Sequence, residues 1–137
     1  MIRRATLDDL AEVVEVGARF LAYSPYAHIP LDRDAFEAFA AQLITGPGAI
    51  FLSDDGMIGG LLNPAYFNPA YVMAAELFWY APKDGQALMD AFETWAVMSG
   101  ARAIQFTGLR DRHAAAIERV FARRGYRPVE TGFIKEL

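Results

Sequence analysis

The sequence contains no cysteine, only two histidines and no long hydrophobic run. The lack of cysteine excludes disulfides, thiol catalysis and cysteine-ligated metal. His28 and His113 do not have the spacing of a helical metal pair, so we expect no metal site. No apolar run reaches the roughly 18 residues that span a bilayer. Residues 1–4 lead into polar sequence rather than into the apolar core of a signal peptide. We therefore expect no membrane partner.

The chain also lacks an excess of positive charge. It carries 13 Lys and Arg against 17 Asp and Glu, which gives a formal net charge of −4. Proteins that bind nucleic acid in general present basic surfaces to the phosphates, so we expect no nucleic-acid partner. Together these absences favour a soluble protein with a cytoplasmic localisation.

The composition is that of a globular protein. The chain has 137 residues, of which 54% are hydrophobic and 22% are charged. A chain of this length buries about two-thirds of its unfolded surface and needs no covalent staple. Because no repeat or low-complexity tract interrupts it, we expect one domain over residues 1–137.

Apolar spacing and turn residues predict alternating strands and helices. The expected strands are residues 2–5, 49–53, 57–62, 71–81, 101–107, 126–129 and 132–135. The expected helices are residues 7–23, 32–44, 86–98 and 113–123. Two Asn-Pro pairs predict a loop at residues 63–69, and the last two strands are expected to form a hairpin. The order β-α-α-β-β-β-α-β-α-β-β indicates a mixed α/β fold around one sheet.

Glu76 is the residue that stands out chemically. Motifs for a nucleophilic serine or for phosphate and dinucleotide loops (GxSxG, GxxxxGK[ST], GxGxxG) are absent. Glu76 lies within the otherwise apolar strand 71–81. Strand alternation predicts that it shares a face with Val72, Ala74, Phe78 and Tyr80. In a cleft, desolvation would make it a general base near neutral pH; at a solvated edge it would be structural.

Four segments carry a resemblance to a known family. They are IRRATLDDL at residues 2–10, AELFWYAP at 75–82, ALMDAFETWA at 87–96 and FARRGYRPVE at 121–130. In this order and spacing, the sequence resembles the GNAT-type N-acetyltransferases, particularly the short bacterial and phage members, over nearly the whole chain. The resemblance implies a GNAT-like acyl-CoA N-acyltransferase fold and acetyl-CoA as the acetyl donor.

The resemblance also implies roles for particular residues. Glu76 would be the catalytic base. Acetyl-CoA would bind in a V beside the central strand, at Leu77, Phe78, Trp79 and Tyr80, with its pyrophosphate at the next helix N-terminus, near Lys83, Gly85 and Gln86. Tyr23, Tyr26 and His28 lie in the connection that borders the acceptor site in this family. They would contact the acceptor substrate or pack as an ordinary loop.

Two departures from the family pattern leave a second interpretation open. The phosphate loop, normally Q/R-x-x-G-x-G/A, is reduced to PKDGQA at residues 82–87, and Phe121 occupies the position where members often have a general-acid tyrosine. The first interpretation is an N-acetyltransferase that acts on a small-molecule or protein amine. The alternative is a GNAT-fold binding or structural module with impaired or no catalysis, associated with a phage particle and its structural proteins. Either interpretation allows a homo-oligomer.

Overall fold

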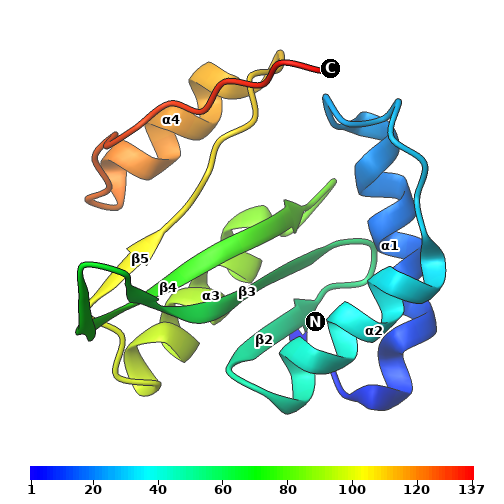
Figure 1. The fold of residues 1–137 in the computed structure, drawn as a ribbon, viewed down its shortest axis with the longest axis horizontal. Helices are drawn as coiled ribbons and strands as arrows, with labels where there is room; N and C mark the ends of the chain where they lie inside the picture. Colours follow the sequence, from blue (N-terminus) through cyan, green and yellow to red (C-terminus); the bar gives the residue numbers. More distant parts are fainter. The chain divides into compact units, whose positions relative to one another are not determined.

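A five-stranded mixed sheet in the order β1-β2-β3-β4-β5 forms the centre of residues 1–107 (Figure 1). The computed structural model describes all 137 residues and divides them into two compact units, residues 1–107 and 108–137. The strands are β1 (Arg3–Arg4), β2 (Gly48–Leu52), β3 (Met57–Ala65), β4 (Asn68–Tyr80) and β5 (Ala103–Gln105). Neighbours from β1 to β4 are antiparallel, whereas β5 is parallel to β4.

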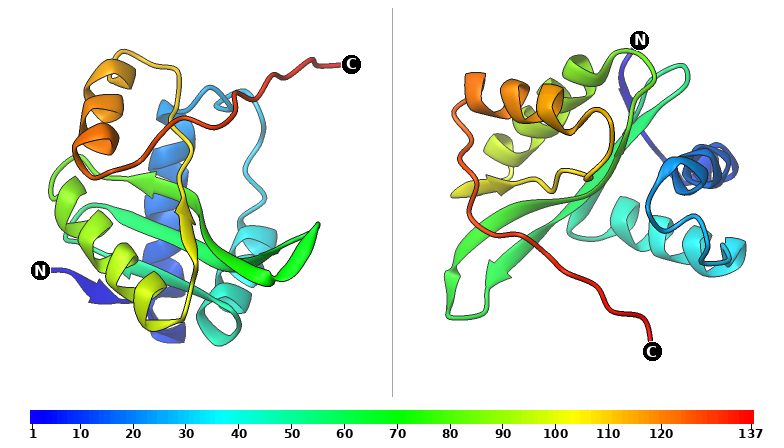
Figure 2. Two further views of the ribbon diagram at one scale, coloured as in Figure 1. Left: turned by 90° about the vertical axis from the view of Figure 1, so that its left-hand side faces the viewer. Right: turned by 90° about the horizontal axis from the view of Figure 1, so that it is seen from above.

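Within residues 1–107, helices cover both faces of the sheet, as the two further views show (Figure 2). The first unit holds the 3-10 turn η1 (Leu7–Asp9), α1 (Leu10–Tyr23), α2 (Arg33–Thr45) and α3 (Gly85–Met98). The second unit holds α4 (Ala114–Arg123). Asp32 caps α2, because its carboxylate accepts the Ala35 N–H at 3.0 Å.

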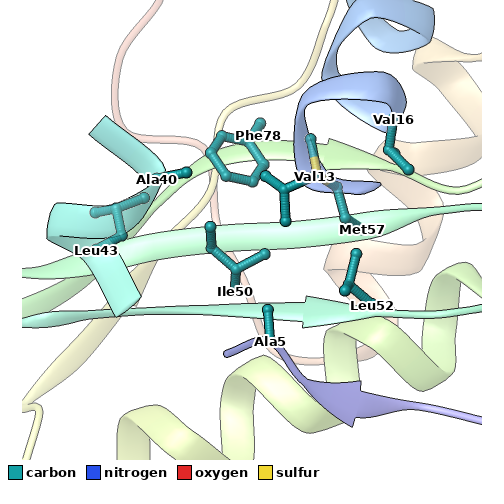
Figure 3. Close-up of a cluster of buried hydrophobic side chains, with 9 residues drawn as sticks. All are labelled: Ala5, Val13, Val16, Ala40, Leu43, Ile50, Leu52, Met57 and Phe78. Atoms are coloured by element: carbon teal, nitrogen blue, oxygen red, sulfur yellow. The ribbon is translucent and has the colours of Figure 1, made fainter. Parts of the chain in front are cut away.

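Two hydrophobic clusters hold these layers together. Under α1 and α2, the cluster consists of Ala5, Val13, Val16, Ala40, Leu43, Ile50, Leu52, Met57 and Phe78 (Figure 3). Under α3, it consists of Ala49, Phe51, Ile58, Ala74, Leu88, Phe92, Trp95 and Ala96. Alternate residues of β2 and β3 enter opposite clusters, which is the period-two pattern of a sheet buried on both faces.

The fold class predicted from the sequence is confirmed, but the predicted C-terminal hairpin is wrong. Residues 126–129 and 132–135 form no strand. Phe133 and Ile134 are 94% and 69% exposed. Alternating apolar residues favour a strand, but a two-stranded hairpin without a hydrophobic face to cover it is marginal in water.

The predicted loop at residues 63–69 is also wrong. β3 and β4 run on through it, and only Tyr66 and Phe67 form the turn of a long hairpin. Pro64 is tolerated because β2 ends its pairing at Leu61, so no strand lies on that side of β3. The Leu62 N–H points to this side, toward the Pro47 carbonyl, and alternation places the missing N–H of Pro64 there too.

Candidate active site

The two parallel strands of the sheet separate soon after they meet. β5 pairs with β4 only over Met73–Ala75, opposite Ala103–Gln105. β4 continues to Tyr80 with β3 as its remaining partner. Over its last five residues, the backbone groups of β4 that point away from β3 therefore have no strand to pair with. The V predicted beside the central strand is present.

A β-bulge marks the point of separation. Gly59 pairs with Phe78 and Gly60 with Glu76, so Leu77 is an extra residue in β4. A Cβ atom on Gly59 would overlap the Phe78 ring, and one on Gly60 would lie 2.8 Å from the Phe92 ring. The Gly59-Gly60 pair of β3 therefore provides the space opposite the bulge.

The bulge corrects the predicted face of Glu76. Strict alternation would place Glu76 beside Phe78 and Tyr80. Instead, Ala74 packs in the cluster under α3, whereas Phe78 and Tyr80 pack with the cluster under α1 and α2. One extra residue at Leu77 shifts the alternation by one position, so Glu76 keeps the phase of Ala74 and not that of Phe78.

Glu76 is buried at this point of separation. Glu76 is only 8% exposed. Its Oε2 accepts hydrogen bonds from the Thr107 N–H at 3.1 Å and from the Thr107 hydroxyl at 3.2 Å. Burial raises the pKa of Glu76 to about 7, and the two Thr107 hydrogen bonds oppose that rise. The carboxyl group can therefore exchange a proton near neutral pH.

The same geometry gives Glu76 a structural role. Thr107 follows β5 by two residues, where the parallel ladder has already ended at Gln105. The Glu76 carboxylate takes the Thr107 N–H that a longer ladder would have paired. The structure thus gives Glu76 a structural contact, and its role as a general base stays a prediction.

The next four residues of β4 have different surroundings. Leu77 is 43% exposed, whereas Phe78 is buried with its ring edge-on to Phe36. Trp79 packs against Phe106, and Tyr80 packs edge-on to Phe20. Because these side chains serve mainly as packing, a cofactor at residues 77–80 would be held by their backbone groups. Direct contact by these residues with acetyl-CoA stays a prediction.

The turn before α3 is short and carries an acidic residue. Asp84 is the N-cap of α3, with a left-handed φ of 57° and no side-chain capping bond. Lys83 and Gln86 are exposed and Gly85 is half-buried. The first backbone N–H groups of α3 have no intrahelical partner, as at any helix start, and are free to meet an anion. The Asp84 carboxylate, however, stands at the same end.

The predicted acceptor residues lie in the connection after α1. The ring of Tyr23, which is 74% exposed, lies 6.1 Å from the ring of Tyr80 at the end of β4. Ser24 holds the start of the connection, since its hydroxyl donates to the Leu21 carbonyl and accepts the Tyr26 N–H. The structure thus brings Tyr23 to the end of the strand that carries Glu76. Tyr26 and His28 are exposed in the turn that follows, and neither bonds to Glu76.

Two further features lie outside this region. Phe121 is in α4 of the second unit, where its ring lies 5.5 Å from that of Tyr126, and its side chain has no proton to donate. A surface groove of about 720 Å³ lies between α3 and β2, lined in part by Arg4, Phe51, Asp90 and Trp95, and does not include Glu76. No helix has both the length and the hydropathy needed to cross a membrane.

Sequence reasoning missed Thr107 and the paired glycines of β3. A threonine at the end of a predicted strand is unremarkable in sequence, and only the parallel pairing brings it to Glu76. Gly59-Gly60 inside an apolar strand was a usable signal, because glycine in a strand interior often marks a bulge or a close approach.

Comparison with known proteins finds similar solved structures but no similar sequence family. No protein-family model and no curated protein matches the sequence. Solved structures do match. A structure described as an acetyltransferase from Arthrobacter sp. FB24 is 19% identical, with a TM-score of 0.75. The match covers 100% of this chain and 96% of that one.

Two other similar structures contain CoA compounds. AAC(6')-Iy, solved with the bisubstrate analogue CoA-S-monomethyl-acetylneamine, is 14% identical with a TM-score of 0.71, over 100% of this chain and 97% of that one. A predicted acetyltransferase from Clostridium acetobutylicum, solved with acetyl-CoA, is 12% identical with a TM-score of 0.70, over 99% and 95%. At these identities the likeness concerns the fold. The chain has the GNAT-type fold of these acetyltransferases.

Proposed function

We propose that this chain is an acetyl-CoA-dependent N-acetyltransferase with Glu76 as its general base. The observation that carries the proposal is a buried carboxyl group, with a pKa raised by burial to about 7, at the point where β4 and β5 separate. The fold adds support, because similar structures were solved with acetyl-CoA and with a CoA bisubstrate analogue. The substrate class is an amine on a small molecule or a protein.

The reaction joins the acceptor amine to the acetyl group. Glu76 accepts a proton from the attacking amine, directly or through one water, while the C–N bond forms at the thioester carbonyl. A backbone N–H near Phe78 or Trp79, on the open side of β4, would stabilise the oxyanion. The C–S bond then breaks and CoA leaves as the thiolate, which takes a proton from solvent.

The fit of the chain to acetyl-CoA is partial. Open backbone groups along residues 77–80 match the pantetheine amides, and the α3 N-terminus with Lys83 suits the pyrophosphate. The short turn and the Asp84 carboxylate oppose that anion. These two features favour the second candidate, a GNAT-fold binding module without catalysis.

Activity measurements on two variants test the proposal. Glu76→Gln should lower turnover of acetyl-CoA by about 10²–10⁴-fold with little change in acetyl-CoA affinity, because a general base is lost while the shape is kept. Glu37→Gln, an exposed carboxylate on α2, is the matched control and should leave turnover unchanged.

Calorimetry with acetyl-CoA and with CoA separates the two candidate functions. Micromolar binding together with turnover of an amine supports the enzyme. No binding at millimolar acetyl-CoA would favour the binding module, and equal turnover by wild type and Glu76→Gln at all pH values would remove Glu76 from the mechanism.

A further inference from the structure

Thr107 contacts only one of the two carboxyl oxygens of Glu76, the candidate base. Its backbone N–H and its hydroxyl both donate to Oε2 of Glu76, at 3.1 and 3.2 Å. No other side chain or backbone group bonds to this carboxyl group, so Oε1 receives no hydrogen bond from the protein. The two oxygens of Glu76 are therefore chemically distinct.

The donors come from a fixed point of the backbone. Thr107 follows the last paired residue of β5, Gln105, by two positions, and β5 is held to β4 through Ala75, next to Glu76. Turning the plane of the carboxyl group away from Thr107 would break both hydrogen bonds at once. The short parallel ladder therefore fixes the orientation of the carboxyl group.

We propose that Thr107 is the positioning residue for Glu76, occupying Oε2 with two donors and leaving Oε1 as the oxygen that takes the proton. The inference rests on the proposed function, in which Glu76 is the base. A proton added to Oε2 would meet the N–H and O–H hydrogens of Thr107 that already point at that oxygen. Oε1, in contrast, has lone pairs that no donor uses.

Thr107 also lowers the pH at which Glu76 becomes a base, against the larger effect of burial. Burial and the Thr107 hydrogen bonds account for the pKa of Glu76, and no charged side chain of β3, α3 or the β5 segment contributes. A donor to a carboxylate favours the ionised form. Loss of the hydroxyl donor should therefore raise the pKa of Glu76, by about half a unit to one unit for one net hydrogen bond.

The test compares Thr107→Val with Thr107→Ser. Valine keeps the shape and the backbone N–H but removes the hydroxyl, whereas serine keeps both donors. The pKa of Glu76 is measured by NMR titration of ¹³C-labelled glutamate side chains in the free protein, with Glu76→Gln used to assign the signal. We expect an upward shift of half a unit to one unit in the valine variant and a titration like that of wild type in the serine variant.

Kinetics provide the second measurement. In Thr107→Val, the acidic limb of the kcat/KM profile, which reports protonation of Glu76, should move to higher pH by the same amount, with turnover about 2–5-fold lower at pH 7 and a smaller loss at pH 9. The KM for acetyl-CoA should not change. An unchanged Glu76 titration in a folded valine variant, or the same shift in the serine variant, would overturn the inference.

Failure of the proposed function and failure of the positioning role of Thr107 give different results. Absence of turnover by the wild type with every amine at every pH would count against the proposed function, whereas the NMR titration does not depend on turnover. If Thr107→Val unfolds, Thr107→Ala removes the same hydroxyl with less bulk, and the same upward shift is expected.

Discussion

Glu76 has a contact that serves the fold, and the same carboxyl group is the one proposed to act in the reaction. Its carboxylate satisfies the Thr107 N–H where the β4–β5 ladder stops, which is a structural contact. Its burial, at 8% exposure, disfavours the charged form and moves its pKa into the range useful for proton transfer. A solvated carboxylate could make the same contact, but its pKa would not be raised.

This burial should leave a signature in stability. The pKa of Glu76 is about 7 in the folded protein, above its ordinary value of 4.5. Between these pH values the folded state binds a proton that the unfolded state has released, so the free energy of unfolding falls as pH rises. We expect it to fall by roughly 2–3 kcal/mol more in wild type than in Glu76→Gln between pH 4.5 and pH 8.

Urea unfolding of both proteins at several pH values measures this difference. Asp9 does not contribute to it, because a hydrogen bond from Arg3 lowers the pKa of Asp9 to about 2, well below this window. Parallel stability curves for the two proteins would show that Glu76 is not held in a desolvated site.

At the scale of elements, the turn between β4 and α3 disfavours acetyl-CoA binding, whereas β4 and α3 themselves suit it. β4 presents open backbone groups and α3 presents its N-terminus, as an acyl-CoA site requires. The connection has a single glycine, Gly85, and its cap residue is Asp84 in a left-handed conformation. Few amides converge there, and the Asp84 carboxylate stands at the helix end proposed for the pyrophosphate.

Replacement of this turn should strengthen cofactor binding. Grafting a glycine-rich Q/R-x-x-G-x-G/A loop in place of Lys83-Asp84-Gly85 should lower the Kd of acetyl-CoA at least tenfold, or about 1.4 kcal/mol, because more N–H groups then point at the phosphates. Calorimetry on the folded graft gives the Kd.

Two single substitutions serve as matched controls for the graft. Asp84→Asn removes the charge and keeps a residue that tolerates the left-handed region, so affinity should rise modestly. Lys83→Gln removes the cation and should weaken binding. An unchanged Kd in a normally folded graft would mean that the turn does not limit affinity.

At the scale of the molecule, the buried hydrophobic core lies in the first unit. All buried hydrophobic residues fall between Ala5 and Ala96, whereas α4 of the second unit has no buried residue. The candidate base, the open strand and the α3 N-terminus belong to this first unit as well. The division into two units was not foreseen, and one domain over residues 1–137 stays a prediction.

Acetyl-CoA should stabilise the folded protein as a whole. A ligand that binds only the folded state adds about 2.7 kcal/mol to the free energy of unfolding at 100 times its Kd. We expect acetyl-CoA to raise the melting temperature of wild type and of Glu76→Gln equally, because in the proposed reaction Glu76 acts on the acceptor amine and not on acetyl-CoA. ATP at equal concentration is the control for unspecific anion binding. A rise with wild type alone would place Glu76 in the cofactor site instead.

Much of the fold could be predicted from local sequence. The apolar stripe of α1, the Asp32 cap of α2 and the apolar run of β4 are short-range patterns, and each specifies its element without help from the rest of the chain. The oddity of Glu76 in that run was also visible, because a carboxylate in a buried strand is costly unless it is paired or titrates.

Long-range contacts required the tertiary structure. The bulge at Leu77 depends on space that Gly59 and Gly60 provide from another strand, and it changes the face on which Phe78 lies. Thr107 reaches Glu76 across 31 positions of sequence through a ladder of three residue pairs. The residues near the C-terminus show the converse, because their alternating pattern had no neighbouring strand to pair with. Local propensity selects an element, but a strand and its register exist only when a partner supplies the hydrogen bonds.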